Sequence, residues 1–258
     1  MNAPLVYITG ASGGIGQALA SRFAGAGWRL ALVARRAEGL RGWAAGQGLD
    51  ESRCAVYGAD VRQIDSIVAA GQDCIVRQGL PDVVIANAGI SVGMDCAQRA
   101  DLDVMREVLE TNLLGLAATF HPFVTPMRQR RSGKLVGVSS LAAIRGLPGH
   151  GAYSASKAGV VNFCESLRGE CRADGVGVVT LLPGYIATPL TERNSYSMPF
   201  LMTADAFAER AFRAIESGTS YRVIPWQMAI MAKLLRLLPN PWLDRALAGR
   251  SRKPRRPG

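Results

Sequence analysis

The feature that most constrains the fold is a glycine-rich segment, Gly10-Ala-Ser-Gly-Gly-Ile-Gly16, between a short apolar run and an alanine-rich helical stretch. Strand, glycine turn and helix in this order predict a phosphate site, because glycines let backbone amides approach a pyrophosphate at the positive end of a helix. The spacing is Gly-x-x-x-Gly-x-Gly, not the usual Gly-x-Gly-x-x-Gly. Taken alone, such a turn could also be an ordinary tight connection, so its context must decide.

Apolar segments of strand length alternate with helical segments along the rest of the chain. Strands are predicted over residues 4–9, 28–34, 53–58, 82–86, 134–138, 177–182 and 221–225, and helices over 64–78, 102–127 and 153–173. This alternation is typical of a parallel sheet with helices on both faces. We therefore predict a single-domain α/β protein, a Rossmann-type doubly wound parallel β-sheet flanked by helices over residues 1–226, with a C-terminal amphipathic helical extension over residues 227–258.

Residues suited to binding a ligand follow several of these strands. Ligands of doubly wound sheets sit at the carboxyl ends of the strands, so Gly16, Arg35, Asp60 and Asn87 should lie along one edge. In the usual fingerprint, an acidic residue about 20 positions after the glycines binds the ribose 2′-hydroxyl. Arg35 and Arg36 stand there instead, and a guanidinium can hold a 2′-phosphate, which favours NADP(H) over NAD(H). Two solvated arginines at a helix start are the alternative interpretation.

Two of the predicted helices contain polar residues that could take part in catalysis. Tyr153 and Lys157 lie one helical turn apart, so both side chains can act on the same small volume. A neighbouring cation should lower the pKa of the phenol from about 10 toward neutral, which would make Tyr153 a proton donor and acceptor. The pair alone could also be a half-buried aromatic beside a solvated charge. Asn112 falls among leucines, where it could be a satisfied core asparagine.

Five motifs in order carry a family resemblance. They are TGASGGIG, NAG, the in-helix Asn112, Ser140 thirteen residues before YSASK, and PGYIATP. In order and approximate separation they are similar to the motifs of the short-chain dehydrogenase/reductase family, in its NADP-preferring type, over residues 4–225.

The resemblance implies a mechanism for interconverting a ketone and a secondary alcohol. Tyr153 would be the general acid in reduction and the base in oxidation, and Ser140 would hydrogen-bond the carbonyl oxygen. Lys157 would lower the pKa of Tyr153 and hold the nicotinamide ribose, and Asn112 would organise a water chain from Lys157. Ser139 competes with Ser140, which is preferred only for its separation from Tyr153.

The resemblance also implies contacts with the cofactor. The glycine turn would hold phosphate and ribose, residues after the third and fourth strands would flank the adenosine, PGYIATP would hold the carboxamide, and Tyr153 and Lys157 would meet the nicotinamide ribose. The further residues concerned are Gly10, Ser12, Gly14, Ile15, Gly16, Arg35, Arg36, Asp60, Val61, Asn87, Ala88, Gly89, Pro183, Gly184, Ile186 and Thr188. His121 and His150 fall in no family motif and are expected to be structural or exposed.

Composition limits the other classes of function. Of the 258 residues, 48% are hydrophobic and 19% charged, which suffices for one substantial core. Five scattered cysteines without a secretory signal predict reduced thiols in a cytoplasmic protein. Residues 227–258 hold eight basic residues and one acidic residue, hence +7 of the net charge of +10, so the body is nearly balanced and nucleic-acid binding is not expected. Neither a membrane-spanning helix nor a metal site is predicted.

Two segments bear on the substrate and on partners. Residues 190–203, with Met198, Phe200, Leu201 and Met202, could form an adaptable apolar lid, which favours a hydrophobic or lipid-like substrate, or could be ordinary core packing. Residues 227–258 could lie on an anionic membrane surface as a peripheral contact, or form a subunit interface or a flap over the substrate. Relatives in the resembled family are commonly homodimers or homotetramers, so the subunit or flap interpretation is favoured.

Two functions from different classes remain. The first is an NADP(H)-dependent oxidoreductase, without a metal, that acts on a small-molecule ketone or alcohol. The second is a non-catalytic NADP(H)-binding module that senses redox state or scaffolds a partner. The complete set of Ser140, Tyr153 and Lys157 favours the enzyme.

Overall fold

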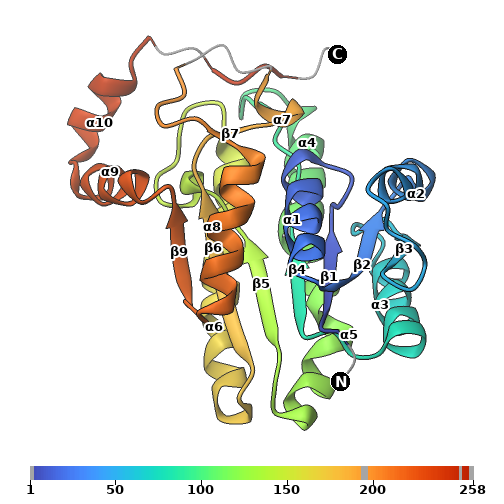
Figure 1. The fold of residues 1–258 in the computed structure, drawn as a ribbon. Helices are drawn as coiled ribbons and strands as arrows, with labels where there is room; N and C mark the ends of the chain where they lie inside the picture. The colour runs from blue at the N-terminus through green and yellow to red at the C-terminus, as the bar shows by residue number, and fades with distance from the viewer. Residues whose placement is uncertain (1–2, 193–196, 250–251, 256–258) are drawn as a thin grey trace.

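In the computed structural model, which describes residues 3–192, 197–249 and 252–255, the core is one parallel sheet. Its seven strands run in the order β3-β2-β1-β4-β5-β6-β9 (Figure 1). They are β1 (Leu5–Thr9), β2 (Arg29–Ala34), β3 (Cys54–Gly58), β4 (Val83–Ala86), β5 (Lys134–Val138), β6 (Gly177–Pro183) and β9 (Tyr221–Ile224). All neighbours pair in parallel, so the predicted doubly wound sheet is confirmed, with its change of direction between β1 and β4.

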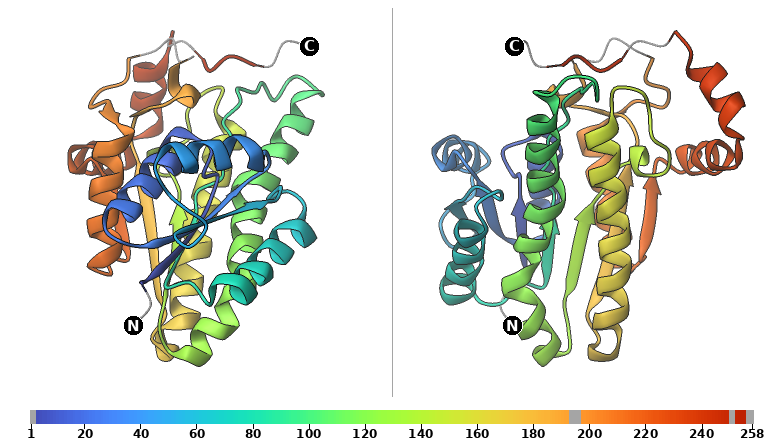
Figure 2. Two further views of the ribbon diagram at one scale, coloured as in Figure 1. Left: turned by 45° about the vertical axis from the view of Figure 1, so that its right-hand side comes forward. Right: turned by 180° about the vertical axis from the view of Figure 1, so that it is seen from behind.

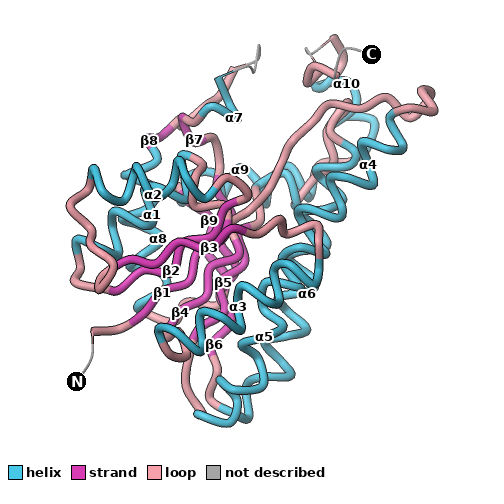
Figure 3. Tube along the Cα trace, turned by 90° about the vertical axis from the view of Figure 1, so that its right-hand side faces the viewer, coloured by secondary structure: helices cyan, strands magenta, loops and turns pink. Residues whose placement is uncertain are grey.

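Helices cover both faces of this sheet (Figures 2 and 3). One face carries α1 (Gly14–Gly25), α2 (Ala37–Gly46) and α8 (Ala204–Glu216), and the other carries α3 (Ile64–Gln78), α5 (Gly115–Arg130) and α6 (Gly151–Cys171). Successive residues of a strand point to opposite faces, and β1 shows this plainly. Val6 and Ile8 pack in one apolar cluster, and Leu5 and Tyr7 pack in the other.

The long helix predicted over residues 102–127 is interrupted. It consists of α4 (Asp101–Leu109), a π-helical turn η1 (Glu110–Leu114) and α5. A π turn inserts one extra residue into the helical ladder, and such turns often occur at functional sites. Here the turn carries Asn112, and no local pattern of residues predicts the turn.

Smaller elements surround the carboxyl edge of the sheet. They are the 3-10 turns η2 (Leu141–Ala143) and η3 (Arg172–Asp174), α7 (Pro189–Glu192), and a two-stranded sheet of β7 (Ile186–Ala187) and β8 (Met202–Thr203). The β7–β8 pairing joins both ends of the predicted lid, residues 190–203, of which 193–196 lie outside the described residues. Phe200 and Leu201 are 52% and 49% exposed, so they are not core residues, whereas Met202 packs against the core.

The predicted extension forms α9 (Trp226–Leu237) and α10 (Asn240–Leu247), which project beside β9 (Figure 1). Met228, Ala232 and Leu243 are buried against the body. Leu234 and Leu237, however, are 63% and 79% exposed, so the extension does not bury its whole apolar side.

The glycine turn between β1 and α1 depends on close approaches that exclude a side chain. A Cβ at Gly16 would lie 2.2 Å from the Gly10 carbonyl oxygen, and Gly10 itself has a φ of +65° and would place a Cβ 2.7 Å from the Cα of Ala88. A Cβ at Gly13, in the same turn, would lie 3.5 Å from its nearest neighbour, the Gly10 carbonyl oxygen. The turn therefore requires glycine at some positions and tolerates a methyl group at another.

We predict that Gly16→Ala destabilises the fold by about 1–3 kcal/mol, because the new methyl group must displace the backbone of the turn. Thermal unfolding followed by circular dichroism measures this as a drop in Tm. Gly13→Ala is the matched control and should leave Tm nearly unchanged. Equal Tm values for the two variants would show that the turn is not tightly packed.

Candidate active site

The ends of β1 and β4 meet beside the glycine turn. Asn87 donates from its side-chain amide to the carbonyl oxygens of Thr9 at 3.1 Å and Gly10 at 3.2 Å, and its backbone N–H donates to the Thr9 hydroxyl at 3.2 Å. These bonds fix the segment Asn87-Ala88-Gly89 against the turn. Gly10, Ser12, Gly14, Ile15 and Gly16 thus lie at the same edge as residues 87–89, as the sequence analysis expects.

The end of β6 reaches the same turn from the other side. Gly184 donates its backbone N–H to the Ile224 carbonyl at 2.8 Å, and Pro183 pairs with β9. A Cβ at Gly14 would lie 2.9 Å from the methyl carbon of Thr188, so this buried threonine lies directly against the glycine turn. Ile186, in β7, is buried. The PGYIATP segment and the glycine turn therefore form two neighbouring walls.

Arg35 and Arg36 follow β2 at this edge and immediately precede α2. Both are exposed. Their side chains make no hydrogen bond or ion pair within the described part of the chain, so both guanidinium groups can meet a solvent-borne anion.

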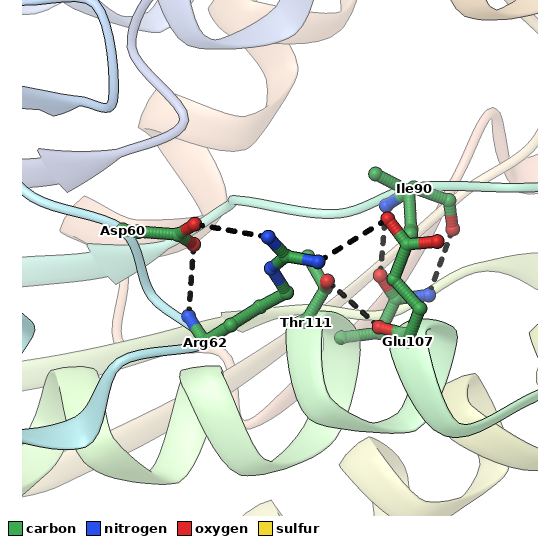
Figure 4. A network of polar contacts seen from close by, with 6 residues as sticks. Asp60, Arg62, Ile90, Glu107 and Thr111 are labelled. Carbon is green, nitrogen blue, oxygen red and sulfur yellow. Dashed lines mark hydrogen bonds and ion pairs between the residues drawn. The ribbon is translucent and has the colours of Figure 1, made fainter. Parts of the chain in front are cut away.

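Asp60 and Val61 follow β3, and Figure 4 shows Asp60 beside Arg62. Asp60 accepts a hydrogen bond from the Arg62 backbone N–H at 3.0 Å and pairs with the Arg62 guanidinium at 3.3 Å. That guanidinium also lies 3.4 Å from a carboxylate oxygen of Glu107 on α4. Arg62 and Glu107 were not predicted from the sequence, because the two residues are 45 positions apart and only the fold brings them together.

The two adjacent serines after β5 have different environments. Ser139 is buried and donates its hydroxyl to the Lys157 carbonyl oxygen at 2.7 Å. Ser140 caps η2 by accepting from the Ala142 N–H at 3.2 Å, and its hydroxyl lies near enough to the Tyr153 phenol to lower the pKa of that phenol. The structure therefore brings Ser140, and not Ser139, to the phenol.

Lys157 is buried one turn beyond Tyr153 on α6. Only 4% of the residue is exposed, and its ammonium donates to the Val138 carbonyl oxygen at 2.8 Å. Burial disfavours the charged form and lowers the pKa of Lys157 to about 8. The ammonium lies 5.9 Å from the centroid of the Tyr153 ring.

The pKa of Tyr153 differs from the expected direction. Burial raises the pKa of Tyr153 above its ordinary value, and the hydrogen bond from Ser140 opposes that rise. The expected lowering by Lys157 is not found, because its ammonium is directed to the Val138 carbonyl oxygen. The phenol of this structure is therefore a protonated group, suited to donating a proton.

Asn112 lies in the π turn and is completely buried. Its side-chain oxygen accepts from the Ile90 N–H at 2.8 Å, and its amide donates to the Ile90 carbonyl at 2.9 Å and to the Ser156 hydroxyl at 3.0 Å. A Cβ at Gly89 would lie 3.3 Å from both the Asn112 oxygen and the Lys157 nitrogen. Asn112 is thus a satisfied buried amide that also adjoins the lysine.

The two histidines lie apart from these contacts. His121 is exposed on α5, whereas His150 is buried immediately before α6. Burial, followed by the charge of Lys253, lowers the pKa of His150. Across the described residues, no group of three His, Cys, Asp or Glu side chains is placed to hold a metal ion. None of the described helices is both long enough and apolar enough to cross a membrane.

Comparisons with known proteins agree with this geometry. Residues 4–198 match the family model described as short chain dehydrogenase. An uncharacterized oxidoreductase of Myxococcus xanthus is 38% identical over 242 residues, which are 93% of this chain and 94% of that protein. An uncharacterized oxidoreductase of Mycobacterium tuberculosis is 35% identical over 248 residues, 94% of this chain and 96% of that one.

A solved structure shows the same arrangement. The alcohol dehydrogenase from the archaeon Thermococcus sibiricus, complexed with 5-hydroxy-NADP, has a TM-score of 0.76 at 26% identity, covering 86% of this chain and 96% of that chain. The chain therefore belongs to the short-chain dehydrogenase/reductase family, whose members are oxidoreductases that act on CH–OH donors with NAD(P)(H) and no metal.

Proposed function

We propose that the protein is an NADP(H)-dependent oxidoreductase that interconverts a ketone and a secondary alcohol, with Tyr153 as the general acid and base. The observation that carries this proposal is the convergence of three side chains, since the ammonium of the buried Lys157 lies 5.9 Å from the centroid of the Tyr153 ring and Ser140 lies near enough to that phenol to affect its pKa. A non-catalytic NADP(H)-binding module would not require these three side chains to converge.

The residues at the carboxyl edge fit a dinucleotide. The glycine turn presents backbone without side chains at Gly10, Gly14 and Gly16, where a Cβ would meet neighbouring atoms at 2.9 Å or less. Backbone amides at the start of α1 are suited to phosphate oxygens. When bound, the nicotinamide cofactor supplies the hydride. We assign the pyrophosphate to this turn, and the adenosine to residues 60–61 and 87–89.

Ser140 and Tyr153 can hold the same carbonyl oxygen. Carbonyl reduction places negative charge on that oxygen, and donors aimed at it stabilise the charge. Tyr153 donates its proton there, because burial keeps the phenol protonated. Ser140 supplies the second hydrogen bond and orients the substrate.

Lys157 and Asn112 support the proton transfer. The Lys157 ammonium uses one N–H on Val138, which leaves two for the ribose hydroxyls. Its pKa of about 8 allows it to exchange a proton near neutral pH. We propose that Asn112 and the backbone at Ile90, which it fixes, order the water that returns a proton toward Tyr153.

The preference for NADP(H) rests on Arg35 and Arg36. Both guanidinium groups are exposed at the end of β2 and lack an acidic partner within the described residues. No carboxylate stands at this position to repel a 2′-phosphate. The archaeal relative was solved with an NADP derivative, which agrees with this assignment.

The substrate is proposed to be largely apolar. Phe200 and Leu201 are exposed apolar side chains in the segment between β7 and β8, beside the proposed nicotinamide walls. Such side chains can cover a hydrophobic ketone.

We propose two surface contacts for the protein. Members of the family often form oligomers, and an apolar groove of about 660 Å³ runs between α4, α5 and α6, lined by Met105, Leu109, Leu113, Leu114 and Phe163 among others, which suits a second copy. The extension exposes Trp226, Ile230, Leu234, Leu237 and Trp242 beside the exposed Lys233, Arg236 and Arg245. Apolar side chains flanked by cations suit an anionic membrane surface.

Tyr153→Phe should reduce turnover of ketones by about a hundredfold to ten-thousandfold, because the ring is kept and the transferable proton is lost. Oxidation of NADPH followed by absorbance measures turnover, and fluorescence titration should show nearly unchanged NADPH affinity. Tyr221→Phe, on the exposed start of β9, is the control and should retain full activity. A Tyr153→Phe enzyme with most of its activity would remove the phenol from the mechanism.

Arg35→Asp should weaken NADPH binding about tenfold to a hundredfold and affect NADH far less, because a charged hydrogen bond contributes about 1.5–3 kcal/mol. Dissociation constants for both cofactors test this directly. Arg41→Asp makes the same charge change on the exposed side of α2 and should alter neither. Equal losses for NADPH and NADH in Arg35→Asp would exclude a 2′-phosphate contact.

Replacing Leu234 and Leu237 together by serine should abolish flotation with anionic vesicles while leaving the sedimentation coefficient unchanged, because the membrane contact and the proposed subunit groove lie on different helices. Point variants are preferable to truncation, since Met228 and Ala232 of α9 are buried. Val76 on α3 is 84% exposed, so Val76→Ser is the control for a general loss of surface hydrophobicity and should leave flotation unchanged. A change in sedimentation without a change in flotation would instead place α9 at a subunit interface.

A further inference from the structure

The chain returns to the active-site edge after α10. Residues 252–255, here called the strap, lie beyond the carboxyl ends of the strands, near the loop that precedes α4 (Figures 1 and 2). Residues 250–251 and 256–258 lie outside the described part of the chain.

A bidentate ion pair fastens the strap. The Arg255 guanidinium donates to the two carboxylate oxygens of Asp101 at 2.6 and 3.0 Å. Asp101 is the first residue of α4 and is only 5% exposed. Bidentate pairs of this kind fix geometry as well as charge, and this one lowers the pKa of Asp101, so the contact persists through the neutral range.

Backbone contacts seat the strap on two loops of the active site. The Gly93 N–H donates to the Pro254 carbonyl oxygen at 3.1 Å, and a Cβ at Gly93 would lie 2.2 Å from the Lys253 carbonyl oxygen. A Cβ at Gly149 would meet the side chain of Arg252 at 3.1 Å. The strap therefore covers the place where the loop after β4 contacts the loop before α6.

The covered loops adjoin the catalytic helix. Met94 donates its backbone N–H to the Gly149 carbonyl at 3.0 Å, and its sulfur lies 3.1 Å from the N–H of Ala152, the residue before Tyr153. The His150 carbonyl accepts from Ser154 in the first turn of α6 at 2.8 Å. The strap is thus separated from the first turn of the Tyr153 helix by a single layer of residues.

Lys253 is the charged group that the strap places there. It is half-buried, and its positive charge reaches the buried His150. No described acidic side chain forms an ion pair with Lys253, and burial without a compensating acid lowers its pKa. A partly desolvated ammonium without an anion is stabilised by a ligand that supplies one.

We propose that the strap forms a wall of the substrate cleft and that Lys253 is a specificity-determining residue, which binds an anionic group at the far end of an otherwise apolar ketone or alcohol. This inference rests on the proposed function, since it assigns the substrate class of the same site. It combines the exposed apolar side chains of Phe200 and Leu201 with a cation carried by the strap. An ammonium recognises the negative charge that carboxylate and phosphate share, so both groups are tested.

The test uses matched probes. Methyl ketones that carry a terminal carboxylate on alkyl chains of graded length are compared with their methyl esters, and dihydroxyacetone phosphate is compared with dihydroxyacetone. The full-length protein should show a kcat/KM at least about tenfold higher for the acid of the best-fitting pair. Lys253→Gln should abolish the preference in kcat/KM for the acid over its neutral partner, because it raises KM for the acid alone. Arg252→Gln removes an exposed neighbouring cation and should leave that preference unchanged.

Binding separates this inference from the proposed function. Calorimetric titration of the probes into the NADP-bound Tyr153→Phe protein needs no turnover, so it reports the acid preference even if the reaction assigned above is wrong. The acids should bind about tenfold more tightly than their neutral partners, and Lys253→Gln should equalise them. Acids and neutral partners that bind equally to the protein with Lys253 intact would overturn the proposal.

A second pair of variants tests the strap itself. Asp101→Asn should release Arg255, reduce the acid preference, and accelerate tryptic cleavage after Arg252, which mass spectrometry detects independently of activity. Asp103→Asn, at an exposed carboxylate of the same helix, should change neither. An unchanged cleavage rate and acid preference in Asp101→Asn would show that the ion pair does not hold the strap.

Discussion

One buried amide connects the parts of this site. Asn112 accepts one hydrogen bond and donates two, and its partners lie on the loop after β4 and on α6. A buried amide costs free energy unless its hydrogen bonds are made, so the position of Asn112 fixes the loop and the helix together. The π turn directs the side chain to these partners. Through Ile90 and Ser156, the same amide fixes the distance between the β4 edge and the Tyr153 helix.

Burial decides the chemistry of the charged and ionisable groups at this edge. The lysine beside the phenol was expected to act on it directly, yet it donates to a strand carbonyl oxygen, and desolvation dominates the pKa of both groups in opposite directions. Desolvation raises the pKa of a phenol and lowers that of an ammonium, because it disfavours each charged form. In water the two pKa values are nearly equal, about 10 for the phenol and about 10.5 for the ammonium, so these opposite shifts move them apart and leave the phenol holding its proton more tightly than the ammonium.

The strands and the glycine turn were predictable because they depend on local sequence. Continuous β-branched runs favour strands that are buried on both faces, and the glycines mark backbone approaches that a Cβ would prevent. The π turn around Asn112 was not predictable, since no local pattern of residues marks it and the hydrogen-bond partners of Asn112 lie 22 and 44 positions away along the chain. The choice of Ser140 over Ser139 rested on spacing alone, and the structure supplies the reason, because the Ser139 hydroxyl is bonded to the helix backbone. Arg62 and Glu107, like Arg255 and Asp101, meet only through the fold.

The separation of Arg255 from Asp101 has a consequence for synthesis of the protein. The two residues are 154 positions apart, so every strand of the sheet has been translated before the pair can form. Closing a contact over so long a loop adds little entropy cost once the sheet has ordered the intervening chain. The sheet, the glycine turn and the Tyr153 helix thus all precede the strap in the order of synthesis. The sheet edge beside the glycine turn can therefore become ordered before the strap reaches it.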